Sequence, residues 1–120
     1  MSRPRSLTYH ELVPVTPPPP GFENSRPASP DDLHALPQPS HAAAHTLEQC
    51  IASHHVAEVD YTDEAGHRST ITIKPAFIRF STAGHVVLWG IPTNAEHWEE
   101  LRLDRINSVR DTGKEFTPTW

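Results

Sequence analysis

Ala57-Glu-Val-Asp-Tyr61 and Ser69-Thr-Ile-Thr-Ile-Lys74 are the two stretches that decide the fold. In both, apolar and polar residues alternate, which is typical of strands with one buried face. Residues 62–66 between them have the composition of a turn, and Gly66 can adopt a positive φ there. The two stretches therefore predict an antiparallel β-hairpin.

Residues 40–55, just before the hairpin, have a helical period instead. Ala44, Leu47 and Ile51 recur at three- and four-residue spacing, and Cys50 lies beside the apolar stripe that they form. Ser40 is suitably placed to cap the start of a helix. We predict one helix here, packed on the sheet.

The residues after Lys74 supply the other predicted strands. Pro75 has no amide hydrogen and is expected to end the second strand, with residues 76–80 as a connection. Residues 85–91 are almost wholly apolar, which is typical of a strand buried on both faces. Leu101-Arg-Leu-Asp-Arg-Ile106 alternates again and predicts another strand, and residues 109–116 add a strand or a helical turn.

Together these elements predict a mainly β, α+β fold. We expect a small, strongly bent antiparallel sheet or Sm-like barrel with one N-terminal helix. Residues 1–40 differ in composition, because they hold ten of the 13 prolines. Proline fixes φ and removes a backbone donor, so we expect a disordered Pro-rich arm in residues 1–40 and a folded domain in residues 41–120. The proline run 17–20 is typical of a semi-rigid spacer, or of a segment that docks into an aromatic groove of a partner.

Charge and cysteine content restrict the function. The net charge is −5, and residues 41–120 carry seven Lys or Arg against eleven Asp or Glu, which disfavours non-specific binding to nucleic acid. The single cysteine, Cys50, excludes an intramolecular disulfide and fits a reducing compartment. No apolar run has the length of a signal peptide or a membrane span, so we expect a soluble, cytoplasmic protein without a membrane partner.

Catalytic and metal motifs are absent from the sequence. There is no Gly-x-Ser-x-Gly motif and no glycine-rich phosphate loop, and Cys50 on the apolar stripe is expected to be inert. His41 and His45 are four residues apart on the predicted helix, a spacing that can bring two imidazoles to one metal ion. No cysteine or carboxylate stands at a standard spacing from them. We therefore expect no catalytic residue, no metal and no cofactor, and a protein that is not an enzyme.

The order of these segments resembles the WYL domain, a small Sm-like β-barrel found mainly in bacterial transcription regulators. The resemblance covers about residues 44–118. It rests on Leu47-Glu-Gln-Cys-Ile51 leading to Val59-Asp-Tyr61, on Pro75 after Ile73-Lys74, on Gly84-His-Val-Val-Leu88 at the place of the Trp-Tyr-Leu signature, and above all on Leu101-Arg-Leu-Asp-Arg-Ile106 with Val109 and Phe116.

The sequence also departs from the family's pattern. Val86 and Val87 stand where the family usually has Trp-Tyr, and Thr72 stands where it often has an arginine. These aromatic and basic groups help to line the ligand-binding surface of the family. The prolines of residues 1–40 are not compatible with the helix-turn-helix that usually precedes the domain.

Arg102 and Arg105 are the first candidate ligand-binding residues, because guanidinium groups bind phosphate in a bidentate way. Lys74 and Arg79 are expected to join them on one face of the barrel. The alternative is that the two arginines pair with Asp104, Glu99 or Glu100 and only stabilise the strand. If the arginines bind an anion, the protein is predicted to be a stand-alone, non-enzymatic regulatory module. It would sense a nucleotide, an oligonucleotide such as single-stranded nucleic acid, or another anionic ligand in transcription-linked regulation.

The second hypothesis is a protein–protein interaction module. It would dock a separate regulator, such as a protein that carries the DNA-binding domain, or associate with itself through an edge strand. Trp98, in the polar stretch between His97 and Glu99, is expected to be either a contact residue or a lid over the barrel. Phosphate recognition weakens steeply with salt, whereas an apolar protein contact does not, and this difference separates the two hypotheses.

Overall fold

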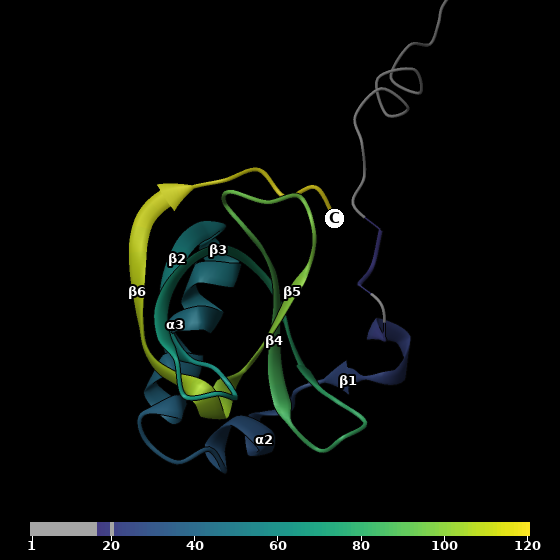
Figure 1. Ribbon diagram of the computed structural model, residues 1–120. Coiled ribbons are helices and arrows are strands. Elements are labelled where there is room, and N and C mark those ends of the chain that lie inside the picture. The colour runs from purple at the N-terminus through teal and green to yellow at the C-terminus, as the bar shows by residue number, and fades with distance from the viewer. Residues whose placement is uncertain (1–16, 20) are drawn as a thin grey trace, which may run out of the picture.

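The structure is a computed structural model that describes residues 17–19 and 21–120. A six-stranded antiparallel sheet dominates it, as the sequence predicted for a mainly β, α+β fold (Figure 1). The elements are the 3₁₀ turn η1 (Phe22–Asn24), β1 (Arg26–Pro27), α2 (Pro30–His34), α3 (Ser40–Ser53), β2 (His55–Thr62), β3 (Arg68–Phe80), β4 (Val86–Pro92), β5 (Glu99–Arg102), the 3₁₀ turn η2 (Leu103–Arg105) and β6 (Ile106–Glu115).

The sheet has the strand order β5-β4-β3-β2-β6, and the short β1 pairs with the far end of β3. Figure 1 shows the sheet curving around α3, with β6 and β2 on one side of the helix and β4 and β5 on the other. The predicted hairpin of β2 and β3 is confirmed, and its register places Ala57 opposite Ile73 and Val59 opposite Ile71. The strongly bent antiparallel sheet is therefore confirmed.

Helix α3 fills the inside of this curve. Its predicted apolar stripe is confirmed, because Ala44, Leu47 and Cys50 are buried against the sheet and Ile51 packs at the edge of the core. The N-cap position belongs to Pro39 rather than to Ser40, which lies inside the helix and is itself buried. The described residues contain no helix that combines the length and the apolar character needed to cross a membrane.

Strand β3 does not end at Pro75, contrary to our prediction. It continues to Phe80, and residues 76–80, expected as a connection, pair with β4. The register shifts between Pro75 and Phe77, and a bulge of this kind accommodates a proline without an amide hydrogen. This extension gives β4 a full-length partner, and every residue of β4 except Trp89 is buried.

The predicted single strand over residues 101–106 is also wrong in part. β5 ends at Arg102, η2 turns the chain over Leu103–Arg105, and β6 begins at Ile106. The alternation that suggested one strand arises because Leu101, Leu103 and Ile106 are all buried on the core side of this corner. Residues 109–116 fall mostly in β6, so of the two predicted alternatives the strand is correct.

The predicted disordered arm is wrong for residues 21–39, which form η1, β1 and α2 and pack against the domain. Their prolines occupy positions that tolerate proline: Pro27 in a two-residue strand, Pro30 at the start of α2 and Pro39 at the cap of α3. Leu33 and Leu36 pack against the hydrophobic core. The rest of the predicted arm, residues 1–16 and 20, lies outside the described residues.

Candidate functional site

The four predicted ligand-binding cations do not form one row on the sheet. Arg79 lies opposite Val87, which in turn lies opposite Arg102, so the structure brings these two arginines to the same face of β3, β4 and β5. Lys74 lies opposite Ile91, before the bulge, and Arg105 lies in η2. Only Arg79 and Arg102 therefore share the predicted arrangement.

The guanidinium of Arg79 holds the N-terminal segment onto the sheet. It donates hydrogen bonds to the Ser25 hydroxyl at 2.9 Å, to the Ser25 carbonyl at 2.8 Å and to the Phe22 carbonyl at 3.3 Å. It also lies 4.0 Å from the centre of the Phe22 ring, a cation–π contact. These contacts engage Nε and Nη2 of Arg79 within the fold.

Arg102 makes the pairing that the alternative interpretation predicted for it. Its Nε donates to Asp104 Oδ1 at 3.0 Å, and Nη2 donates to the second carboxylate oxygen. The hydrogen bonds from Arg102 lower the pKa of Asp104, and the charge of Arg105 contributes in the same direction. Arg102 has no second ion-pair partner, and neither Lys74 nor Arg105 has any, among the described residues.

Arg102 opens onto a hollow of about 290 Å³ on the outer face of the sheet. We call it the Arg102 hollow. Its lining combines Arg102, Glu100, Trp89 and Val87 of β5 and β4 with Ser81, Thr82, Ala83 and His85 of the β3–β4 turn and Gly21, Asn24 and Ser25 of the N-terminal segment. The guanidinium and hydroxyl groups can bind a phosphate, and the indole of Trp89 offers a face on which a base can stack.

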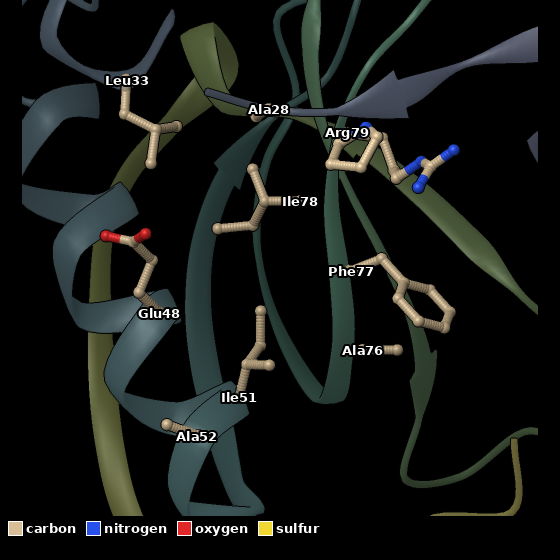
Figure 2. A pocket seen from close by; sticks show the side chains of 10 residues that line it. Ala28, Leu33, Glu48, Ile51, Ala52, Ala76, Phe77, Ile78 and Arg79 are labelled. Carbon is tan, nitrogen blue, oxygen red and sulfur yellow. The ribbon is translucent and has the colours of Figure 1, made fainter. Parts of the chain in front are cut away.

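A second, apolar depression lies between α3 and β3, with a volume of about 410 Å³. Figure 2 shows Glu48, Ile51 and Ala52 of α3 along one wall and Ala76 and Ile78 of β3 along the other. We call it the helix–strand groove. Pro27, Ala28, Leu33, Phe77 and Arg79 complete its lining. Because Glu48 and Arg79 are its only charged residues, the groove suits an apolar side chain rather than an anion.

Cys50, His41 and His45 lie outside the linings of both the Arg102 hollow and the helix–strand groove. Burial raises the pKa of the Cys50 thiol to about 11, so it is protonated at neutral pH. Among the described residues, no group of three or more His, Cys, Asp or Glu side chains is arranged to hold a metal ion. His41 and His45, the pair with metal-like spacing, each contact a glutamine side chain instead, Gln38 and Gln49 respectively.

Sequence reasoning missed two features of this surface. The Arg102 hollow includes Gly21, Asn24 and Ser25, which were assigned to the arm. It also includes Trp89, which belongs to the strand expected to be buried on both faces but is only half-buried. The other is an aromatic cluster of Phe77, Trp98 and Trp120. No local pattern predicts it, because its three residues come from distant parts of the sequence.

Comparison with known proteins gives a likeness of fold. No family model matches the chain, and no curated protein matches it. Among solved structures, the chain is similar to proteasome accessory factor B/C (PafBC) of Arthrobacter aurescens, with a TM-score of 0.58 and 13% sequence identity. The match covers 77% of this chain but only 13% of that chain. The two proteins therefore share a fold over one small part of PafBC.

Proposed function

We propose that this protein is a non-enzymatic regulatory binding module with a WYL-like fold, acting in transcription-linked regulation in the cytoplasm. The fold shared with part of PafBC is compatible with this class of function. The resemblance of residues 44–118 to the WYL domain supports it independently. We assign the ligand to the Arg102 hollow and its chemistry to anions, with a nucleotide or a single-stranded oligonucleotide as the preferred class.

The Arg102 hollow is the observation that carries this proposal. Among the four predicted cations, Arg102 lines a hollow of ligand size, and its guanidinium donates to a side-chain carboxylate and not to backbone carbonyls. Its side chain is 29% exposed, so its donors can be reached from outside. Trp89 and the hydroxyl groups of Ser81 and Thr82 add stacking and hydrogen bonding to the charge of Arg102. Glu100 offers acceptors that suit the amino groups of a base.

Asp104 acts as a competitor in this arrangement. Its carboxylate occupies the two guanidinium positions that a bound phosphate would use. A ligand must therefore replace Asp104 on Arg102. Neutralising Asp104 should strengthen anion binding, whereas removing Arg102 should abolish it. A purely structural ion pair would not produce effects of opposite sign.

The test is anisotropy of fluorescein-labelled single-stranded DNA and RNA, titrated with the full chain at low and at physiological salt. We expect Arg102→Ala to weaken binding at least tenfold and Asp104→Asn to strengthen it. Arg110→Ala is the matched control, because Arg110 forms a similar pair with Glu58 outside the hollow. The proposal is wrong if neither nucleic acid binds at low salt, or if Arg110→Ala weakens binding as much as Arg102→Ala.

The helix–strand groove favours a second candidate function, a protein–protein interaction module. The groove is lined mostly by apolar residues and is larger than the Arg102 hollow. Such a surface can dock a separate regulator, including one that carries a DNA-binding domain, or a second copy of the chain. Contact there should be nearly insensitive to salt.

Self-association is the version of this candidate that can be tested directly. Ala52→Glu places a charge on the wall of the groove, and Gln49→Glu places the same charge on α3 outside its lining. Sedimentation equilibrium should show a dimer that Ala52→Glu dissociates and Gln49→Glu preserves. A monomer at all concentrations would contradict self-association.

A further inference from the structure

The aromatic cluster of Phe77, Trp98 and Trp120 borders the Arg102 hollow, because Phe77 lies opposite Trp89 in the pairing of β3 with β4. We call this cluster the aromatic cradle. Ring centroids lie 5.9 Å apart for Phe77 and Trp98, 5.4 Å for Trp98 and Trp120, and 6.3 Å for Phe77 and Trp120. All three side chains are half-buried. The cradle gathers residues from β3, from the loop before β5 and from the segment after β6.

Pro17 of the same chain contacts the aromatic cradle. The indole Nε1–H of Trp98 donates a hydrogen bond of 2.6 Å to the carbonyl oxygen of Pro17. Pro19 is buried, and its carbonyl accepts from the amide of Phe22 at 3.0 Å. The ring of Phe22 then packs against Phe77 at 5.0 Å. The proline segment is therefore anchored at both of its ends.

We propose that the aromatic cradle is a proline-recognition site, which residues 17–19 fill within the same chain and which a proline-rich segment of a partner protein can take over. Proline segments favour the polyproline II conformation, so little entropy is lost when they bind. They offer carbonyl acceptors but no amide donors, and an indole N–H between flat rings matches that chemistry. The contact between Trp98 and Pro17 is an example of this recognition.

The intramolecular segment competes with any partner. A short tether gives it an effective concentration in the millimolar range, so a separate peptide binds the wild-type chain only weakly. Replacing the internal prolines with alanine should therefore expose the cradle and raise the apparent affinity of the chain for the peptide. The resulting affinity gain measures the internal competition.

The experiment uses isothermal titration calorimetry with a synthetic peptide that copies residues 15–22. We titrate it into the full chain and into an arm variant of the full chain that carries Pro17→Ala, Pro18→Ala and Pro19→Ala. The arm variant should bind at least tenfold more tightly than the wild-type chain. Adding Trp98→Phe to the arm variant should weaken binding at least tenfold, while adding Arg110→Ala, on β6 outside the cradle, should not. A peptide with alanine at every proline should not bind.

Circular dichroism melts establish first that each variant is folded. The proposal is overturned if a folded arm variant does not bind the peptide, or if it binds the proline-free peptide equally well. Occupation by the same chain is overturned if the wild-type chain is a dimer and the peptide dissociates this dimer. In that case the prolines of a second copy fill the cradle. None of these outcomes depends on whether the Arg102 hollow binds an anion.

Discussion

Gly90 is the residue at which β4 comes closest to β3. A Cβ atom at this position would lie 2.7 Å from the carbonyl oxygen of Lys74 and 2.9 Å from the side chain of Ile73. The contact falls opposite Pro75, next to the bulge that lets β3 continue. The neighbouring backbone cannot move away easily, because it belongs to the sheet. The glycine therefore allows the extended pairing of β3 with β4.

Replacing Gly90 with alanine should lower the free energy of unfolding by about 2 kcal/mol, because the added methyl group overpacks a buried position. Urea denaturation measures the loss. Gly84→Ala is the control, since Gly84 has a positive φ of 86° but no atom within 4 Å of the added Cβ. Gly84→Ala should lower the free energy of unfolding by about 1 kcal/mol, from backbone strain alone. Equal costs for the two variants would show that the close approach does not constrain β4.

Individual residues also show how far a sequence can predict a site. The pairing of Arg102 with Asp104 was among the predicted alternatives, because the two residues are two positions apart. The partners of Arg79 were not predictable in this way. Ser25 and Phe22 lie 54 and 57 positions before it, in a stretch whose composition indicated disorder. Hydrogen bonds between residues so far apart in the sequence can be found only in the folded structure.

At the scale of elements, Arg79 joins β3 to the segment that contains η1 and β1. Arg79→Lys keeps the charge but loses the planar set of donors, and hydrogen bonds to a charged group contribute about 1.5–3 kcal/mol. We expect the segment to detach locally. Hydrogen exchange should then speed up at the Ala28 amide, which donates to the Ile78 carbonyl.

Arg68→Lys is the control for this prediction. Arg68 pairs with Asp60 on the exposed face of the hairpin, and its side chain is 68% exposed. An exposed ion pair of this kind contributes little to stability. Exchange at Ala28 should therefore stay at the wild-type rate in this variant. An unchanged rate in Arg79→Lys as well would contradict the anchoring role of Arg79.

The elements that the sequence predicted best are those with a local period. The helix stripe and the β2–β3 hairpin follow from three- or four-residue and two-residue spacing, and both are confirmed. The ends of β3 and β5 were missed because long-range pairing decides them. β3 continues past Pro75 because it pairs there with β4. Leu103 faces the core although it lies in a turn and not in a strand.

At the scale of the whole molecule, the domain begins before residue 41. Leu33 and Leu36 pack against the core, and β1 covers the end of β3. A chain of residues 41–120 should be less stable than a chain of residues 21–120 by about 3 kcal/mol, the value expected for exposing two partly buried leucines. Thermal melts measure the difference. Equal melting temperatures would instead support the boundary at residue 40.

Stability should also fall in acid. Ion pairs and hydrogen bonds lower the pKa of Asp32, Glu58, Asp60 and Asp104, in each case chiefly through an arginine. Since these pKa values lie below those of the unfolded chain, the unfolded state binds more protons as the pH falls. The stabilisation is present above about pH 4, the ordinary carboxyl range, and is lost below it.

Melting temperatures between pH 7 and pH 2 test this expectation. The melting temperature should stay nearly constant down to about pH 5 and then decrease. Asp32→Asn should reduce the decrease, because Asp32 is held both by Arg26 and by the backbone amide of Ser29. A melting temperature that rises between pH 4 and pH 2 would contradict the direction of these pKa shifts.

The three tryptophans are divided between the two candidate sites, and this division makes the chain its own optical reporter. Trp89 lines the Arg102 hollow, whereas Trp98 and Trp120 belong to the aromatic cradle. Indole emission depends on polarity and on nearby quenching groups. A Trp89→Phe chain therefore emits only from the cradle, and a chain with Trp98→Phe and Trp120→Phe emits only from the hollow. The two neighbouring surfaces are thus reported by different tryptophans, without attaching a dye to the protein.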